Sequence, residues 1–317
     1  MEAPMTQTPF LHPFVTRSHR GVYGIIRRDN QILLIRKARG PYTGLYDLPG
    51  GSPEAGETPE QTVIREIKEE TNCDVISHTL LGEKTIFFSA FTKASGEKGC
   101  LQHTGVLFNI EVSGEPTTQG DGLDSNGAEW VDIDSLSCQN ATPFALIGCG
   151  KEVISLANEQ DYPVDTFMRT GNETRPAGEY PMIAGVFLFN SKDNIILQKV
   201  AYTKKVDAGK WSYSAGGHVD AGESYEQAAL RELAEEMGVV ASHAEFVGRG
   251  YTLREGKPRA FHHVFKVVSD DPIVFDPKEV AETKEFTVPE LVEQITHHPE
   301  NFKDIFAQIF MKWYEKE

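Results

Sequence analysis

The sequence contains one pattern twice. Residues 51–73 read GSPEAGETPEQTVIREIKEETNC, and residues 217–239 read GHVDAGESYEQAALRELAEEMGV. In each copy a glycine is followed after five residues by a glutamate, and after seven more by an arginine-glutamate pair. Both copies then continue with an apolar residue, one further residue and two glutamates. The shared spacing predicts two copies of one structural unit.

Each copy carries the start signal of a helix. Thr58 and Pro59 place a capping hydroxyl before a proline, and Gln61 stands three residues after the cap. Ser224 and Gln227 repeat the cap and the glutamine. The apolar residues of each helix fall on one stripe that must face a core, namely Val63, Ile64 and Ile67 in the first copy and Ala229, Leu230 and Leu233 in the second.

Three glutamates crowd one face of each predicted helix. They are Glu66, Glu69 and Glu70 in the first copy, and Glu232, Glu235 and Glu236 in the second. Like charges at this spacing cost a helix a few tenths of a kcal/mol per pair, roughly, unless a cation sits among them. A single run of this kind is usually a solvated helix face. Because the glycine, the cap and the Arg-Glu pair recur with the same offsets, we favour a site for Mg²⁺ or Mn²⁺, which prefer oxygen ligands.

Strands are predicted on both sides of each helix. Residues 21–26 and 32–35 form two apolar runs joined by a turn at Asn30, and residues 183–189 and 195–197 repeat them as a hairpin. Further β-branched and aromatic runs follow the helices, at 85–91, 105–112 and 259–268. Each half closes with a short acidic strand and a helix. The fold class expected is therefore an α/β sandwich in each half.

The chain of 317 residues is longer than one core usually organises, so we expect two domains. The first is expected at 1–158 and the second at 180–317. Between them, residues 159–179 are polar and punctuated by prolines and glycines, which is typical of a linker. The alternative is that this stretch forms the first strand and loop of the second domain.

Charge and composition narrow the class of partner. The net charge of −16 disfavours binding to polymeric nucleic acid or to an anionic membrane. No stretch approaches the roughly 20 apolar residues of a membrane span, and residues 1–14 lack the pattern of a signal peptide. We therefore expect a cytoplasmic protein with a small-molecule partner, and the oligomeric state stays open.

Both repeats resemble the Nudix box, whose pattern is Gly, five residues, Glu, seven residues, Arg-Glu, an apolar residue, any residue, Glu-Glu, any residue, Gly and an apolar residue. The second copy matches at every position. The first departs at Asn72, where the pattern has glycine, and asparagine tolerates the left-handed conformation that a helix end needs. The resemblance covers most of residues 20–158 and 180–317. It implies two α/β/α sandwich domains in tandem with mixed sheets.

The resemblance also implies an activity and a set of residue roles. The activity is metal-dependent hydrolysis of the diphosphate linkage in a nucleoside diphosphate joined to another moiety, such as ADP-ribose, a nucleotide sugar or a nucleoside triphosphate. The six glutamates above would hold Mg²⁺, or Mn²⁺, and help deprotonate water, and the carbonyls of Gly51 and Gly217 would complete the ligand set. Two orienting ion pairs are implied as well, Glu57 with Arg65 and Glu223 with Arg231.

The second domain resembles a narrower branch, the isopentenyl diphosphate isomerase-like Nudix proteins. The resemblance lies in Gly209-Lys210-Trp211 and Gly217-His218-Val219 together with the lysines upstream of them. The isomerases have a cysteine where this chain has Gly216, which favours hydrolysis over isomerisation. His218 is either a contact to metal or phosphate or, as we favour, a loop residue.

Cations lie ahead of both boxes, where substrate phosphates would be expected. Arg36 and Lys37 in the first domain, and Lys199 and Lys205 in the second, are the candidate substrate-binding residues, and their alternative is a solvated loop. An alternative also stands for the whole protein. A non-catalytic nucleotide-binding or sensor protein with the same fold would bind ligand without turnover, but the complete glutamate sets favour an enzyme.

Overall fold

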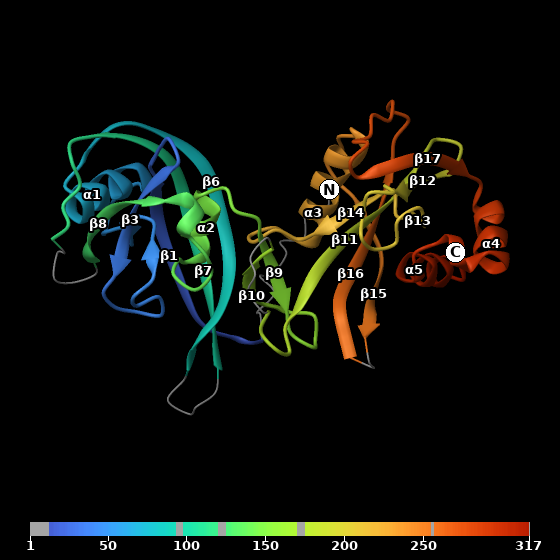
Figure 1. Cartoon of the computed structure of the whole chain (residues 1–317), viewed down its shortest axis with the longest axis horizontal. Coiled ribbons are helices and arrows are strands. Elements are labelled where there is room, and N and C mark those ends of the chain that lie inside the picture. Colours follow the sequence, from blue (N-terminus) through green and yellow to red (C-terminus); the bar gives the residue numbers. More distant parts are fainter. Residues whose placement is uncertain (1–12, 93–97, 120–124, 170–174, 255–256, 317) are drawn as a thin grey trace, which may run out of the picture. The chain divides into compact units, whose positions relative to one another are not determined.

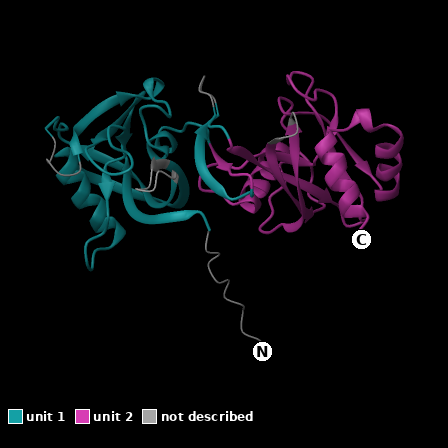
Figure 2. Cartoon of the chain, turned by 90° about the horizontal axis from the view of Figure 1, so that it is seen from below, with its two compact units in different colours: residues 1–153, 160–177 teal, residues 154–159, 178–317 magenta. Residues whose placement is uncertain are grey.

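The computed structural model describes residues 13–92, 98–119, 125–169, 175–254 and 257–316. The chain divides into two compact units, which Figure 2 shows in different colours. Unit 1 comprises residues 1–153 and 160–177, and unit 2 comprises residues 154–159 and 178–317.

Unit 1 contains two sheets, labelled in Figure 1. In the first, β1 (Val15–Ile25) pairs parallel with β7 (Lys98–Ser113) and antiparallel with β5 (Gly50–Gly51), while β6 (Asp74–Thr92) pairs antiparallel with β7. The second sheet consists of β2 (Arg27–Arg28), β3 (Gln31–Lys37), β4 (Tyr46–Asp47) and β8 (Ser125–Asp132). The two apolar runs predicted at 21–26 and 32–35 thus enter different sheets, and only the short β2 forms a hairpin with β3.

Helix α1 (Pro59–Thr71) joins the two sheets of unit 1 through one core. Val63 and Ile67 are fully buried against residues of both sheets, among them Val22 of β1 and Leu33 of β3. Ile64, predicted on the same stripe, is 41% exposed, because the helix packs on the core through Val63 and Ile67. The predicted cap is present, since the Thr58 hydroxyl accepts from the Gln61 N–H and the Gln61 side chain accepts from the Thr58 N–H. After β8 the chain forms a 3₁₀ turn at Ile133–Ser135 and then α2 (Pro143–Gly148).

Unit 2 is built around β11 (Tyr180–Phe189). This strand pairs antiparallel with β9 (Val153–Ala157), β12 (Ile195–Val200) and β14 (Ala215–His218), and parallel with β16 (Lys257–Val268). The remaining strands are β13 (Trp211–Ser212) and β17 (Val280–Phe286), which pair with β12, and β15 (Glu245–Arg254), which pairs with β16. Mixed sheets with helices confirm the predicted α/β class.

Alternate residues of β11 serve two cores. Val186 and Leu188 pack in the core that contains α3 (Tyr225–Met237). Phe187 and Phe189 pack on the other side, in a core with α4 (Val288–His297) and α5 (Asp304–Tyr314). Figure 1 shows α3 and α5 on opposite sides of β11. The sheet of unit 2 is therefore buried on both faces.

The units divide the chain differently from the boundaries expected from sequence. Strand β10 (Pro163–Met168) lies inside the stretch expected as a linker, 159–179, and it packs against β6 of unit 1. The Ser89 hydroxyl donates to the Asp165 carboxylate at 2.5 Å. Residues 154–159, in turn, belong to unit 2, where β9 pairs with β11. A short strand with polar residues carries no clear sequence signal, and residues 170–174 of the expected linker lie outside the described residues.

Among the helices that the structure describes, none combines the length and the apolar composition that a membrane span needs.

Candidate functional site

The two boxes have the same arginine-centred geometry. In unit 1, Nε and Nη2 of Arg65 donate to the two carboxylate oxygens of Glu57 at 2.8 and 3.0 Å. Its Nη1 donates to Glu66 at 2.9 Å and to Glu69 at 3.0 Å, and Nη2 also reaches the Ser52 carbonyl at 3.3 Å. The predicted ion pair is therefore present, and the same guanidinium also fixes two of the box glutamates.

Unit 2 repeats these contacts around Arg231. Nε and Nη2 of Arg231 donate to Glu223 at 3.0 Å each, and Nη1 donates to Glu232 at 2.8 Å and to Glu235 at 3.2 Å. Nη2 also donates to the carbonyl of His218 at 2.9 Å, so this histidine contributes its backbone to the box.

The third glutamate of each box is buried and binds the glycine pair. Glu70 accepts from the N–H of Gly50 at 2.8 Å, and Glu236 accepts from the N–H of Gly216 at the same distance. The side chain of Gln198 also donates to Glu236, at 2.9 Å. Each carboxylate thus links the box helix to the strand that contains the glycines.

The following glycines, Gly51 and Gly217, pack closely against a box glutamate. A Cβ on Gly51 would lie 2.5 Å from Oε1 of Glu66, and a Cβ on Gly217 would clash with the Glu232 carboxylate in the same way. Any side chain here would displace a box glutamate. This packing is a reason for glycine that is independent of the predicted role of its carbonyl.

The box glutamates differ in their pKa values. Burial raises the pKa of Glu70 to about 8 and that of Glu236 to about 7, and it also raises the pKa of Glu66 and of Glu232. The hydrogen bonds from Arg65, by contrast, lower the pKa of Glu57 to about 2. The negatively charged form is therefore disfavoured in Glu66, Glu70, Glu232 and Glu236. It is favoured in Glu57, which is paired with Arg65.

The donor set of each box fits a divalent cation. All candidate donors are oxygens, which Mg²⁺ and Mn²⁺ prefer, and one guanidinium contacts three carboxylates, which leaves an excess of negative charge. Within the described ranges, however, no three His, Cys, Asp or Glu side chains converge as a ready-made metal site. The reason lies in the partners just described, because Arg65 holds Glu66 and Glu69 while Glu70 faces Gly50. The most exposed box carboxylates are Glu69 in the first box, at 56%, and Glu235 in the second, at 61%, so these have most room to turn.

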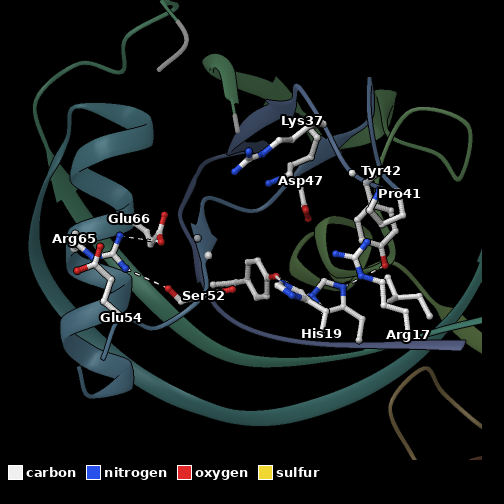
Figure 3. Close-up of a pocket in the computed structure, with 17 residues that line it drawn as sticks. Arg17, His19, Lys37, Pro41, Tyr42, Asp47, Ser52, Glu54, Arg65 and Glu66 are labelled. Carbon is white, nitrogen blue, oxygen red and sulfur yellow. Dashed lines mark hydrogen bonds and ion pairs between the residues drawn. The ribbon is translucent and has the colours of Figure 1, made fainter. Parts of the chain in front are cut away.

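A cavity of about 620 Å³ opens beside the first box (Figure 3). Gly50, Gly51, Arg65 and Glu66 contribute one wall of it. Three cationic residues also line it, Arg17 of β1, Lys37 of β3 and Arg39 in the loop that follows. The cavity thus brings positive charge to within reach of the box glutamates.

The cavity contains a row of buried polar groups that the motif analysis did not identify. The Tyr23 hydroxyl lies 2.7 Å from Nε2 of His103 and 3.4 Å from Nε2 of His19, and the Tyr42 hydroxyl lies 3.2 Å from Nδ1 of His103. Desolvation lowers the pKa of His103 to about 3, so this imidazole is neutral at physiological pH. Nearby, the hydroxyl of Thr142 donates to the buried Asp47 carboxylate at 2.5 Å.

The predicted substrate-binding cations have different surroundings. Lys37 lines the cavity. Arg36 does not belong to the lining, because its side chain covers the Tyr46 ring at 4.1 Å and donates to the Gly44 carbonyl at 3.1 Å. In unit 2, Lys199 binds Glu282 at 2.9 Å and lies over the Trp211 ring, while Lys205 is exposed.

Unit 2 also contains buried polar atoms that lack hydrogen bonds. Among the described residues, both ring nitrogens of His262 and the hydroxyl of Tyr213 have no partner. Burial lowers the pKa of His262 to about 3.

At the ends of the box helices, Asn72 and Gly238 both adopt the left-handed conformation, with φ of 63° and 69°. Asparagine at the first box thus fills the position that glycine takes at the second.

Comparison with known proteins agrees with this duplicated geometry. The NUDIX domain model matches residues 16–146 and again residues 179–308. An ADP-ribose pyrophosphatase of Methanocaldococcus jannaschii is 38% identical over 128 residues, which cover 40% of this chain and 66% of that protein. An uncharacterised Nudix hydrolase of Pseudomonas aeruginosa is 36% identical over 140 residues, covering 44% of this chain and 80% of that protein.

The resemblance to the isopentenyl diphosphate isomerase-like branch also has a counterpart among known proteins. An isopentenyl-diphosphate Delta-isomerase of Pectobacterium atrosepticum is 29% identical over 162 residues, which cover 50% of this chain and 89% of that protein. The two domain matches together span well over half of the chain. The chain therefore belongs to the Nudix family of pyrophosphohydrolases and contains two NUDIX domains in tandem.

Proposed function

We propose that the first domain hydrolyses the diphosphate linkage of a nucleoside diphosphate that carries a second, sugar-like group. The observation that carries this proposal is the cavity, because it places cations beside the box glutamates. Its volume of about 620 Å³ is within the usual range for small-molecule sites, roughly 300 to 1,000 Å³. The similarity to an ADP-ribose pyrophosphatase supports the same substrate class.

Different residues of the first domain would bind the phosphate and the metal. Lys37 and Arg39 would bind the phosphate oxygens from the cavity wall. Glu66, Glu69 and Glu70, with the carbonyl of Gly51, would hold a divalent metal. Such an ion, when bound, neutralises charge on the phosphoryl oxygens and supplies hydroxide near neutral pH.

The ion pair would act indirectly. Arg65, fixed by Glu57, keeps the carboxylates of Glu66 and Glu69 beside the glycine pair. The Glu70 carboxylate, bound to the N–H of Gly50, aligns that pair with the helix. Arg65 and Glu57 are therefore positioning residues, whose loss displaces the ligands without removing them, whereas Glu70 belongs to the ligand set itself.

For the second domain we propose the same class of reaction with a different substrate group. Its box contacts match those of the first domain, with Glu232, Glu235, Glu236 and the Gly217 carbonyl as the metal ligands. The surroundings of its candidate substrate-binding lysine differ from those of Lys37, since Lys199 is bound to Glu282 and lies over the Trp211 ring. Gly216, which stands where the isomerases have cysteine, provides no side chain for isomerase chemistry.

The test is a substrate screen on a chain in which only the first box is intact. Glu235→Gln with Glu236→Gln disables the second box, and hydrolysis is followed with Mg²⁺ or Mn²⁺ on ADP-ribose, nucleotide sugars, oxidised nucleoside triphosphates and dinucleoside polyphosphates. We expect turnover of ADP-ribose or a nucleotide sugar, and a KM raised about tenfold or more by Lys37→Met. Lys68→Met, on the exposed end of α1, is the matched control. Absence of turnover with either metal on all four classes would refute the proposal.

A further inference from the structure

The polar row in the first-domain cavity has two ends. It runs from His19 through Tyr23 and His103 to Tyr42, with each step given by a hydrogen-bond contact. Tyr23, inside the row, pairs with Gly50 across the sheet, so the middle of the row is next to the glycine pair of the box. Figure 3 shows His19 and Tyr42 well separated from Glu66 and Arg65 across the cavity. Both ends of the row thus lie away from the site of diphosphate chemistry.

The protonation state of His103 determines how many hydrogen-bond donors the row contains. A neutral imidazole has one donor nitrogen and one acceptor nitrogen. His103 is 2% exposed and packs among the rings of Tyr23, Tyr42 and Phe144, which disfavours the charged form. One tyrosine hydroxyl must therefore donate to His103, and the other must accept from it.

Both possible arrangements leave one donor and one acceptor at the ends. If Tyr23 donates to His103, the other ring nitrogen donates to Tyr42, whose own proton is then available, and Nδ1 of His19 is an acceptor. If Tyr42 donates instead, every hydrogen bond in the row reverses, so Tyr42 offers a lone pair and His19 offers Nδ1–H. In the part of the chain that the structure describes, neither end makes another side-chain hydrogen bond.

The chemistry of the ends selects the ligand. A phosphate or carboxylate only accepts, and can satisfy one end alone. A hydroxyl both donates and accepts, so a pair of hydroxyls satisfies both ends in either arrangement. We propose that His19 and Tyr42, linked through Tyr23 and His103, form a subsite for the paired hydroxyls of a sugar next to the diphosphate. This subsite rests on the proposed function and names the group that accompanies the diphosphate.

The test compares substrates that differ only in hydroxyls. The chain with the second box disabled is given ADP-ribose, an ADP ester of cyclopentanol, which lacks the hydroxyls of the second group, and ADP-ribose whose adenosine is 2′,3′-dideoxy. These two analogues distinguish the second sugar from the nucleoside's own ribose. We expect the cyclopentanol ester to have a kcat/KM about tenfold or more below that of ADP-ribose, because a buried hydroxyl partner is lost, and the dideoxy analogue to be hydrolysed like ADP-ribose.

Variants then assign that preference to the row. Tyr42→Phe and, independently, His19→Ala should each remove most of the preference, mainly through KM, while the poorer analogue is hydrolysed as before. Tyr46→Phe is the control, since this tyrosine also donates a hydrogen bond, to Glu129 at 2.8 Å, but does not line the cavity. The subsite would be overturned if a variant lost kcat/KM equally on all three substrates. It would also be overturned if the chain with the row intact showed no preference for ADP-ribose over the poorer analogue.

Failure of the proposed function would give a different result. If the chain hydrolyses none of these compounds, the subsite is measured by titration calorimetry with ribose 5-phosphate. Binding that Tyr42→Phe weakens about tenfold would support the subsite while the hydrolysis proposal fails. No binding, or equal binding by both chains, would overturn it.

Discussion

Arg65 holds the carboxylate of Glu57 with two nitrogens, at 2.8 and 3.0 Å, while the same guanidinium contacts Glu66 and Glu69. This arrangement needs a planar group with several donors, which lysine lacks. Arg65 therefore connects the loop before the helix to the glutamates that we assign to the metal.

The first prediction concerns this arginine. In a chain with the second box disabled, Arg65→Lys should lower kcat by about tenfold or more, because a single ammonium cannot hold the carboxylates of Glu57, Glu66 and Glu69 together. The melting temperature should stay close to that of the wild type, since lysine keeps a positive charge beside the carboxylates. Arg169→Lys, in the exposed pair with Glu152, is the control. Wild-type kcat in Arg65→Lys would show that the arginine does not position the site.

The second prediction concerns the glycine of the second box. Gly217→Ala should abolish most activity of a chain whose first box is disabled by Glu69→Gln and Glu70→Gln, because the new Cβ displaces Glu232. Gly248→Ala is the matched control in the same unit, since its nearest neighbour would be Ile309 at 4.0 Å. If both substitutions leave the rate unchanged, the close packing of Gly217 has no functional role.

These local predictions rest on features that the sequence already indicated. The capping box at Thr58 and the left-handed Asn72 follow from short-range patterns, and the structure contains both. Local patterns are reliable here because every partner lies within a few turns of one helix. The ion pairs of Arg65 with Glu57 and of Arg231 with Glu223 were implied by the resemblance to the Nudix box, and the structure contains both contacts.

The cavity was not predictable in the same way. Tyr23, Tyr42 and His103 come from three distant segments, and only the parallel pairing of β1 with β7 brings two of them together. No spacing rule joins such residues. Arg36 and Lys37 illustrate the same limit, because adjacent residues of a strand point to opposite faces and the sequence alone did not say which faced the cavity.

The third prediction concerns pH and the buried His262. The unfolded histidine takes up a proton near pH 6.5, whereas the folded one does so only near pH 3, so the unfolded state binds more protons between these values. Stability should therefore fall as pH falls from about 6.5, by on the order of 3 kcal/mol at pH 4.5. His262→Leu should remove this part of the pH dependence in urea unfolding.

Other groups contribute in the opposite direction, so the difference between the variant and the wild type is the quantity to measure. Glu236 has a raised pKa and favours the folded state as pH falls below about 7. Because this contribution is common to both chains, it cancels in the comparison. Equal pH profiles for His262→Leu and the wild type would contradict a neutral, buried His262.

The central claim is that both boxes hydrolyse a phosphoanhydride with a divalent metal. Its most direct measurement is the Mg²⁺-dependent release of phosphate-containing products from ADP-ribose and nucleotide sugars by four chains. These are the wild type, Glu69→Gln with Glu70→Gln, Glu235→Gln with Glu236→Gln, and all four substitutions together. We predict that each double variant retains the activity of the other domain, and that the fourfold variant loses activity to background. Undiminished release by the fourfold variant, or release that persists after chelation of the metal, would contradict the account.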